Sequence, residues 1–304
     1  MYRIEPVSFL SQGERVMGRL FLPETDRPTS TYVVMGPVSS VKEQSPLQYA
    51  TRLAASGAVA LTFDPRCFGE SEGEPRQFDD PQRKVADLRA AADFLLARPG
   101  VDPTTLTMLG ICMGCNWAAQ AVADDDRFRR AIFVAGSYSI RSRRLEAAGG
   151  EEVFDKQLAI YRDAVERFEH DGTIDFHTLV ADRMEDSYFS WAVPFHWYGM
   201  WTDPGPLTYK GGWQNRLATI SDYGHYAFDV AEAFERITVP TLVFNSTASA
   251  TPLDTVRSLM GTLPPAESEL VATGNQLQTQ FYDDPATIDL VVARIVDQPK
   301  PGRK

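Results

Sequence analysis

One segment near the middle of the chain restricts the possible folds more than any other. Residues 106–111 (LTMLGI) form a short apolar run typical of a strand buried on both faces, and residues 115–125 (CNWAAQAVADD) follow with the apolar spacing of a helix. The turn that joins them, residues 110–114, has the sequence GICMG. Glycines on both sides of the central residue allow a sharp, strained turn that exposes its side chain. The segment therefore predicts a nucleophile elbow with Cys112 at its tip, where the helix dipole favours the thiolate.

Two other interpretations of this turn stay open. Cys112 can be a buried cysteine in an ordinary glycine-containing turn, and Cys112 with Cys115 also forms the C-x-x-C pattern of redox proteins, which likewise lies between a strand and a helix. The chain is much larger than a thioredoxin module, and the elbow already explains both glycines. We therefore favour the elbow and expect Cys115 to be a small, packed residue in the first helical turn.

Apolar runs and helical stretches alternate along most of the chain. Residues 2–9 and 15–22 alternate in a β manner and predict an antiparallel hairpin. Further short apolar runs predict buried parallel strands at 31–36, 58–64, 106–111, 131–136, 241–245 and 268–273. Helical spacing occurs at 45–57, 80–100 and 115–125. The predicted fold class is therefore α/β, with a doubly wound, mostly parallel sheet.

The alternation stops between about residues 141 and 227, and we interpret this stretch as an inserted, mainly helical cap. The division leaves residues 1–140 and 228–304 as the core. The cap is expected to hold a helix at 151–169 and an aromatic tract. Aromatic side chains in such a tract either pack the cap against the core or line a pocket for an apolar or aromatic substrate. The tract contains Trp191, Phe195, Trp197, Tyr198, Trp201 and Trp213, of which Trp191, Trp197 and Trp201 are the substrate-binding candidates.

On these features the chain resembles the α/β-hydrolases, and within them the dienelactone-hydrolase-like and prolyl-peptidase-like branch. Residues 35–76 are similar to that branch's oxyanion loop, helix and D-x-R-G-x-G-E-S turn, and the elbow follows at the expected distance. The resemblance implies an α/β-hydrolase fold with eight strands and a nucleophile at Cys112. It also implies an oxyanion hole made by two N–H groups, one from Met113 and one from the loop after the third strand. Because Pro37 in that loop has no N–H, Val38 is expected to supply the second.

The chain departs from the family's catalytic triad at two positions. In α/β-hydrolases the acid follows a late strand and the histidine base follows the last one. Here the acid position falls near Ser249, and Gln278 stands in the histidine position. A glutamine cannot take up a proton at neutral pH, although it can hydrogen-bond a substrate. Gln278 is therefore expected to bind substrate and not to act as a base.

Three residues could replace the missing base. His225 lies where the cap returns to the core, His196 lies among the cap aromatics, and Glu43 lies on the loop after the oxyanion strand. Dienelactone hydrolases, which the chain resembles, use a glutamate in a comparable loop to contact their cysteine. Each candidate also has a simpler interpretation, because Glu43 can cap the following helix and a histidine among aromatic residues can be merely packed. His170 and His177 lie in polar stretches and are expected to be solvated.

Composition and charge exclude several classes of function. Thirty Lys and Arg against 41 Asp and Glu give a net charge of −11, which argues against general nucleic-acid binding. No apolar run approaches the ~18 residues of a transmembrane helix, and the first residues lack the apolar region of a signal peptide. A cytoplasmic protein without membrane contact is therefore expected. The cysteines and histidines show no spacing for a disulfide framework or a zinc site, so neither a metal nor a cofactor is expected.

These features predict an enzyme that acts on an acyl substrate (an ester, thioester or lactone) through Cys112 and an oxyanion hole, as a hydrolase or thioesterase does. Two alternatives stay open. One is a non-hydrolytic acyltransferase or cyclase of natural-product biosynthesis, and the other is a ligand-binding protein that has kept the fold without the activity. The expected partner is a small-molecule acyl or polyketide-like substrate, and a homodimer is compatible with the sequence.

Overall fold

The structure is a computed structural model of the chain, and it describes residues 1–25, 30–181, 183–189, 212–264 and 267–297. Several residues that the sequence singles out lie outside these ranges, namely Trp191, Phe195, His196, Trp197, Tyr198 and Trp201. Their predicted roles as base or substrate contacts stay predictions.

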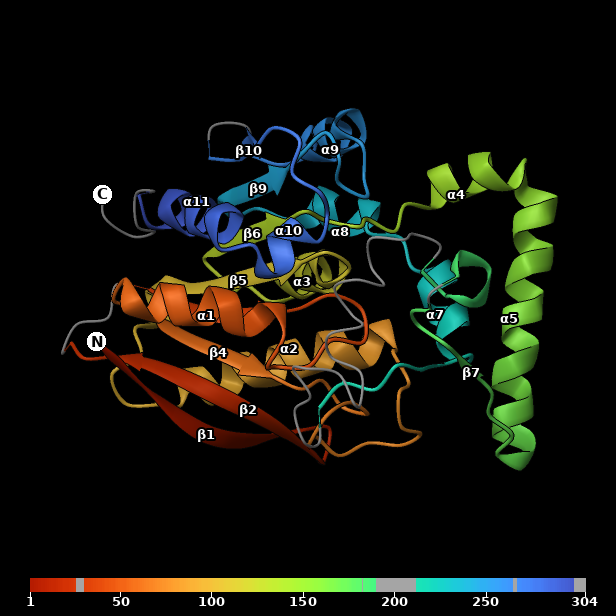
Figure 1. Cartoon of the computed structure of the whole chain (residues 1–304), viewed down its shortest axis with the longest axis horizontal. Coiled ribbons are helices and arrows are strands. Elements are labelled where there is room, and N and C mark those ends of the chain that lie inside the picture. Colours follow the sequence, from red (N-terminus) through yellow and green to blue (C-terminus); the bar gives the residue numbers. More distant parts are fainter. Residues whose placement is uncertain (26–29, 182, 190–211, 265–266, 298–304) are drawn as a thin grey trace.

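An eight-stranded sheet forms the centre of the chain, with strand order β1-β2-β4-β3-β5-β6-β9-β10 (Figure 1). The first two strands form the predicted antiparallel hairpin, and β2 also pairs antiparallel with β4. From β4 onward every neighbouring pair is parallel. The strands are β1 (Tyr2–Ser11), β2 (Glu14–Pro23), β3 (Thr31–Met35), β4 (Val59–Phe63), β5 (Leu106–Ile111), β6 (Arg130–Val134), β9 (Thr241–Asn245) and β10 (Glu269–Ala272). The predicted α/β class and the mostly parallel sheet are confirmed.

Helices cover both faces of this sheet. The inner strands are buried on both faces, so that Val33 of β3 belongs to one apolar cluster and Val34 to the other. Helices α2 and α3 pack in the first cluster through Leu88 and Trp117, and α1 and α11 pack in the second. The core helices are α1 (Ser45–Ala55), α2 (Pro81–Leu96), α3 (Gly114–Asp124), α8 (Ala231–Arg236), α9 (Leu253–Met260), α10 (Gln280–Asp283) and α11 (Pro285–Val296), with a short 3-10 turn η1 (Pro103–Thr105). None of the described helices combines the length and apolar character needed to span a membrane.

The described elements from α4 to α7 lie to one side of the sheet, away from both chain ends (Figure 1). The long helix among them is α5, which packs against α4 and α7 and buries only Phe154 completely. These elements are α4 (Arg141–Ala148), α5 (Glu151–Asp171), β7 (Phe176–His177), η2 (Met184–Asp186), β8 (Leu217–Ala218) and α7 (Ser221–Ala227). The helix expected at 151–169 is therefore present, while the division into core and cap stays a prediction.

Candidate active site

The turn between β5 and α3 has the backbone of a sharp elbow. Cys112 adopts a positive φ of 56°, a left-handed conformation that is strained for a residue with a side chain. A Cβ added to Gly110 would lie 2.8 Å from Cα of Cys115, and one added to Gly114 would lie 2.3 Å from the carbonyl oxygen of Gly36. Neither position admits a side chain, which is the steric reason for the two glycines. The same contact brings the loop after β3 against the elbow.

Three groups surround the Cys112 sulfur at hydrogen-bonding positions. They are the Tyr282 hydroxyl, the backbone N–H of Met113 and the Gln278 side-chain amide. Cys112 is 7% exposed, and its burial raises the pKa of the thiol, although the three hydrogen bonds oppose this shift. The resting form at neutral pH is thus the thiol. The thiolate that the helix N-terminus was expected to favour is therefore not the resting form, because desolvation outweighs the hydrogen bonds to the sulfur.

Gln278 is held in one orientation by its neighbours. Its Nε2 donates to the carbonyl oxygen of Ala135 at 2.7 Å and to the Tyr282 hydroxyl at 3.1 Å, while its Oε1 accepts from the N–H of Ala250 at 2.9 Å. Because the Gln278 amide donates to the Tyr282 oxygen, the hydroxyl hydrogen of Tyr282 stays available for the Cys112 sulfur. Gln278 stands at the sequence position expected for the histidine, both hydrogens of its amide are already donated, and it has no proton to exchange with the sulfur.

The two predicted oxyanion donors lie at the elbow and on the adjoining loop. The Met113 N–H faces the Cys112 sulfur. Val38 is buried, and in the described part of the chain its N–H has no hydrogen-bond partner. The neighbouring N–H of Ser39 behaves differently, since it donates to Asp79. A buried N–H without a partner is uncommon in proteins, so Val38 keeps a donor available for an oxygen of the substrate.

Glu43 lies in a network of charges and not at the sulfur. One of its oxygens is 3.0 Å from Nη2 of Arg19 and 3.1 Å from Nζ of Lys42. The same ammonium group of Lys42 is 2.7 Å from Asp64. Burial and the nearby Asp64 charge raise the pKa of Glu43. Among the described residues no hydrogen bond joins Glu43 to Cys112, so the structure does not bring these two candidates together.

His225 lies on α7 and pairs with a carboxylate that the sequence did not single out. Its Nε2 is 3.1 Å from Oδ1 of Asp79, and its Nδ1 is 3.4 Å from the hydroxyl of Tyr188. The imidazole packs against Trp117, with ring centroids 6.1 Å apart. No hydrogen bond joins His225 to Cys112 in the described residues. The imidazole is therefore held ready for proton transfer, but with a partner other than the sulfur.

Asp79 is fully buried and is held by opposite charge. Nζ of Lys84 lies 2.7 Å from one of its oxygens, and the N–H of Ser39 donates to the same oxygen at 2.8 Å. Burial alone would raise the pKa of this carboxyl, but the charge of Lys84 and the hydrogen bonds from His225 and Lys84 outweigh burial and hold the pKa well below its usual range. Asp79 is consequently an anion at neutral pH.

Asp79→Asn is expected to lower the free energy of unfolding at pH 7 by about 3 to 5 kcal/mol, because it leaves buried Lys84 without its counter-charge. The unfolded carboxyl has a pKa of about 3.9. The stabilisation that ionised Asp79 provides is therefore complete above that pH. It is lost as the pH falls toward the lower pKa that Asp79 has in the folded protein. Urea unfolding between pH 7 and pH 3.5 should show the gap to wild type narrowing below about pH 4. The exposed Asp163→Asn is the control, and a gap that stays constant with pH would contradict this account.

A cavity of about 530 Å³ begins next to the elbow. It is lined by Met113, Ser137, Tyr138, Ser139, Arg144, Tyr161, His177, Tyr188, Asp222, His225 and Tyr226. His177 is partly buried, and its Nε2 is 2.6 Å from Oδ2 of Asp222, so the expectation that it is solvated is wrong. The lining therefore combines the His177–Asp222 pair, the imidazole of His225 and several tyrosine rings. In the described residues no group of three or more His, Cys, Asp or Glu side chains could hold a metal ion.

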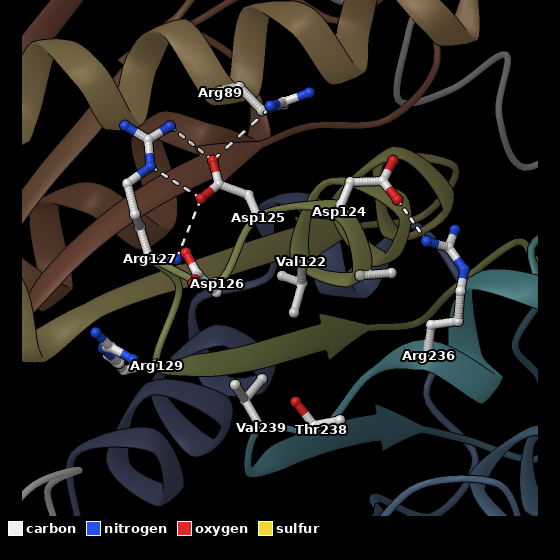
Figure 2. Close-up of a pocket in the computed structure, with 11 residues that line it drawn as sticks. Arg89, Val122, Asp124, Asp125, Asp126, Arg127, Arg129, Arg236, Thr238 and Val239 are labelled. Carbon is white, nitrogen blue, oxygen red and sulfur yellow. Dashed lines mark hydrogen bonds and ion pairs between the residues drawn. The ribbon is translucent and has the colours of Figure 1, made fainter.

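A second cavity, of about 500 Å³, lies elsewhere and has a different character (Figure 2). Figure 2 shows that its charged side chains pair with one another across the opening, with Arg236 on Asp124 and both Arg127 and Arg89 on Asp125. Its lining residues include no cysteine and no histidine. We therefore place the candidate active site at the elbow and the adjoining first cavity.

Three residues of this site were missed by the sequence analysis, namely Asp79, Tyr188 and Tyr282. Tyr282 follows Gln278 by four residues, a spacing that brings side chains together across one helical turn, and this signal could have been used. Asp79 and His225 are 146 residues apart, and no local pattern connects them. Their pairing depends on the return of α7 to the core.

Several known proteins resemble this chain in sequence over less than half of its length. A family model described as "Serine aminopeptidase, S33" matches residues 44–186. The uncharacterised protein PA2218 of Pseudomonas aeruginosa is 39% identical over 123 residues, which is 40% of this chain and 33% of that protein. The thiohydrolase aneE of Aspergillus aculeatus is 36% identical over 129 residues, which is 42% of this chain and 40% of that protein. The chain thus aligns with 33 to 40% of the length of the curated relatives that it matches first.

Two solved structures share the fold over nearly the whole chain. The α/β-hydrolase GrgF from Penicillium superposes with a TM-score of 0.79 at 17% identity, covering 97% of both chains. The crystal structure of PA2218 gives a TM-score of 0.77 at 23% identity, covering 97% of this chain and 93% of the other. The predicted α/β-hydrolase fold is confirmed. The family model and the sequence matches each cover less than half of the chain, so the likeness to the α/β-hydrolases over the whole chain is one of fold.

Proposed function

We propose that this protein is an acyl-transfer enzyme that takes the acyl group of a thioester onto the sulfur of Cys112. In the first step the sulfur attacks the thioester carbonyl carbon, the bond from that carbon to the departing sulfur breaks, and the proton of the Cys112 thiol ends on the departing thiol. The observation that carries the proposal is the position of Cys112, which stands at the tip of a strained elbow with the Met113 N–H directed at its sulfur.

The donors at the elbow suit the intermediate of this step. A tetrahedral intermediate carries a negative oxygen, which two N–H groups can stabilise. The Val38 N–H is buried and has no partner among the described residues, and the Met113 N–H can turn from the sulfur to the oxygen as the new bond forms. The Tyr282 hydroxyl, which already hydrogen-bonds the sulfur, is suited to stabilise it while it loses its proton.

Among the described residues no general base contacts the Cys112 sulfur, and this favours thioesters over oxygen esters as substrates. A departing thiol has a pKa of about 8.5 and leaves readily as a thiolate, so its departure needs no general acid. An alcohol is an acid nearly as weak as water, with a pKa of about 15.7, and an alkoxide leaves only if a general acid protonates it. Gln278 stands at the sequence position expected for the histidine that would donate that proton, and it cannot do so.

The names of the relatives are compatible with this chemistry. The Aspergillus relative is called a thiohydrolase, and the Penicillium relative grgF is called a polyketide transferase, 35% identical over 79 residues. We propose a small-molecule acyl or polyketide-like thioester as the substrate here. Hydrolysis and transfer share the step at Cys112 and differ in the molecule that later removes the acyl group.

A matched pair of substrates tests the proposal. An acyl thioester of N-acetylcysteamine and the oxygen ester with the same acyl group and the same chain length should differ by about 10²-fold or more in kcat/KM, in favour of the thioester. The reference is the ratio of the rates at which a free thiol in solution attacks the same two substrates. Equal kcat/KM values for the two substrates would contradict the proposed role of Gln278. No turnover of either would favour a ligand-binding protein without activity.

A further inference from the structure

His225, which lines the cavity beside the elbow, forms with Asp79 an acid–base pair that the proposed step at Cys112 does not use. His225 is 5% exposed, and Asp79 is fully buried. Nε2 of His225 lies 3.1 Å from Oδ1 of Asp79. The carboxylate comes from the loop before α2, and the imidazole comes from α7. Lys84 and the Ser39 N–H hold the other carboxylate oxygen, so Asp79 cannot turn away from the imidazole.

The carboxylate determines which imidazole nitrogen is basic. Because Asp79 is an anion, it accepts a hydrogen bond, and the hydrogen of the neutral imidazole therefore lies on Nε2. The lone pair then lies on Nδ1, which faces the cavity and the hydroxyl of Tyr188. At 3.4 Å this contact is longer than a strong hydrogen bond to nitrogen. The hydroxyl of a bound molecule can replace it.

The position of the cavity connects this base to the elbow. Met113 lines the cavity, and the same residue supplies the N–H at the Cys112 sulfur. A molecule in the cavity therefore approaches an acyl group on Cys112 from the side on which His225 lies.

The charges of the cavity suit a neutral molecule. The guanidinium of Arg144 donates to the carbonyl oxygens of Tyr226 and Phe228 and to the hydroxyl of Ser139. It is therefore already engaged and is poorly placed to bind a carboxylate or phosphate. The rings of Tyr161, Tyr188 and Tyr226 offer apolar surface beside these polar groups.

We infer that Asp79 and His225 form a relocated acid–base pair that activates the hydroxyl of an acyl acceptor in this cavity. The inference rests on the proposed function, because it assumes that Cys112 carries the acyl group. The acceptor gives its proton to Nδ1 of His225, its oxygen bonds to the acyl carbon, and the bond from that carbon to the Cys112 sulfur breaks. The thiolate takes up a proton from solvent, and His225 returns its proton to solvent. His225 is then a catalytic residue of the second step, and Asp79 is a positioning residue.

His225→Gln separates the two steps. Rapid acid quench after mixing with an acyl thioester, followed by intact-mass measurement, reports formation and decay of the acyl adduct. In the variant, formation of the adduct should keep its wild-type rate, while its decay and steady-state turnover should fall by about 10² to 10⁴-fold. The acylated protein should therefore accumulate. His170→Gln, at an exposed histidine on α5, is the matched control and should behave as wild type.

Each other result has a defined meaning. Decay at the wild-type rate in His225→Gln would overturn the inference and leave the proposed function intact. Loss of adduct formation in a folded His225→Gln protein would also overturn it, because His225 would then serve Cys112 directly. A wild-type protein and a His225→Gln variant that both form no adduct would instead refute the proposed function. Asp79→Asn should slow decay of the acyl adduct without changing the rate of its formation. A merely structural role of Asp79 would not separate the two rates in this way. If the Asp79→Asn protein does not fold, the result with His225→Gln alone tests the inference.

Benzyl alcohol is the probe for the acceptor, since its ring suits the tyrosine surface. Free acid as the product identifies water as the acceptor, and benzyl ester identifies a bound alcohol. Either product supports the inference when its formation depends on His225. Benzyl ester formed equally fast by wild type and His225→Gln would contradict it.

Discussion

Replacement of Cys112 by alanine is expected to lower thioester turnover by about 10³-fold or more, because the acyl group then has no sulfur to occupy. The melting temperature should fall by only about 2 to 4 °C, since Cys112 is buried in an apolar cluster but the change removes a single sulfur atom. Steady-state kinetics and thermal unfolding of the same preparations measure both effects.

Cys115→Ala is the matched control. Cys115 is fully buried, and its sulfur lies 3.2 Å from the carbonyl oxygen of Gly110. Its loss should lower stability modestly and leave turnover largely intact. Retained turnover in Cys112→Ala would exclude covalent catalysis. Equal losses in the two variants would favour the redox C-x-x-C interpretation.

The paired change Gln278→His with Ser249→Asp is expected to raise hydrolysis of a simple activated oxygen ester by about 10²-fold. Ala248 and Leu277 form an isolated parallel bridge, so the residues that follow them, Ser249 and Gln278, lie on adjoining loops. A histidine at 278 would meet an aspartate at 249 on one side and Cys112 on the other. Either change alone should have little effect, because an unoriented histidine keeps the wrong tautomer.

This experiment also tests the role of His225. In the wild-type background His225→Ala should block turnover, whereas in the paired variant it should be better tolerated, because the new base can serve the second step as well. If the paired change does not raise ester hydrolysis and His225→Ala does not lower turnover, the reaction does not depend on proton transfer at Cys112. A cyclase or a binding protein would then be the better explanation.

The fold could be predicted from the sequence because its signals are local. Each buried strand is a short apolar run, and the elbow is specified by two glycines whose absent side chains are replaced by the backbone of Cys115 and Gly36. These features need no knowledge of distant contacts. The antiparallel hairpin and the parallel strands were predictable for the same reason.

The site was less predictable because its contacts join distant parts of the chain. The preference of a helix N-terminus for thiolate is a local rule, and it failed at Cys112 because desolvation depends on what packs above the sulfur. Asp79 meets His225 only when α7 returns to the core, and His177 is partly covered because β7 brings it to Asp222. Gln278 was identified by its place in the chain, but its fixed orientation comes from Ala135 and Ala250.

The central claim, that Cys112 carries an acyl group, is tested most directly by locating that group. The protein is mixed with excess acyl thioester of N-acetylcysteamine, quenched in acid within its first turnover and analysed by intact-mass measurement and peptide mapping, alongside Cys112→Ala and Cys115→Ala. The account predicts a mass increase of one acyl group in wild type and in Cys115→Ala, located at Cys112, and none in Cys112→Ala. An active wild-type protein that never gains this mass, or that gains it at Cys67 or Cys115, would contradict the account.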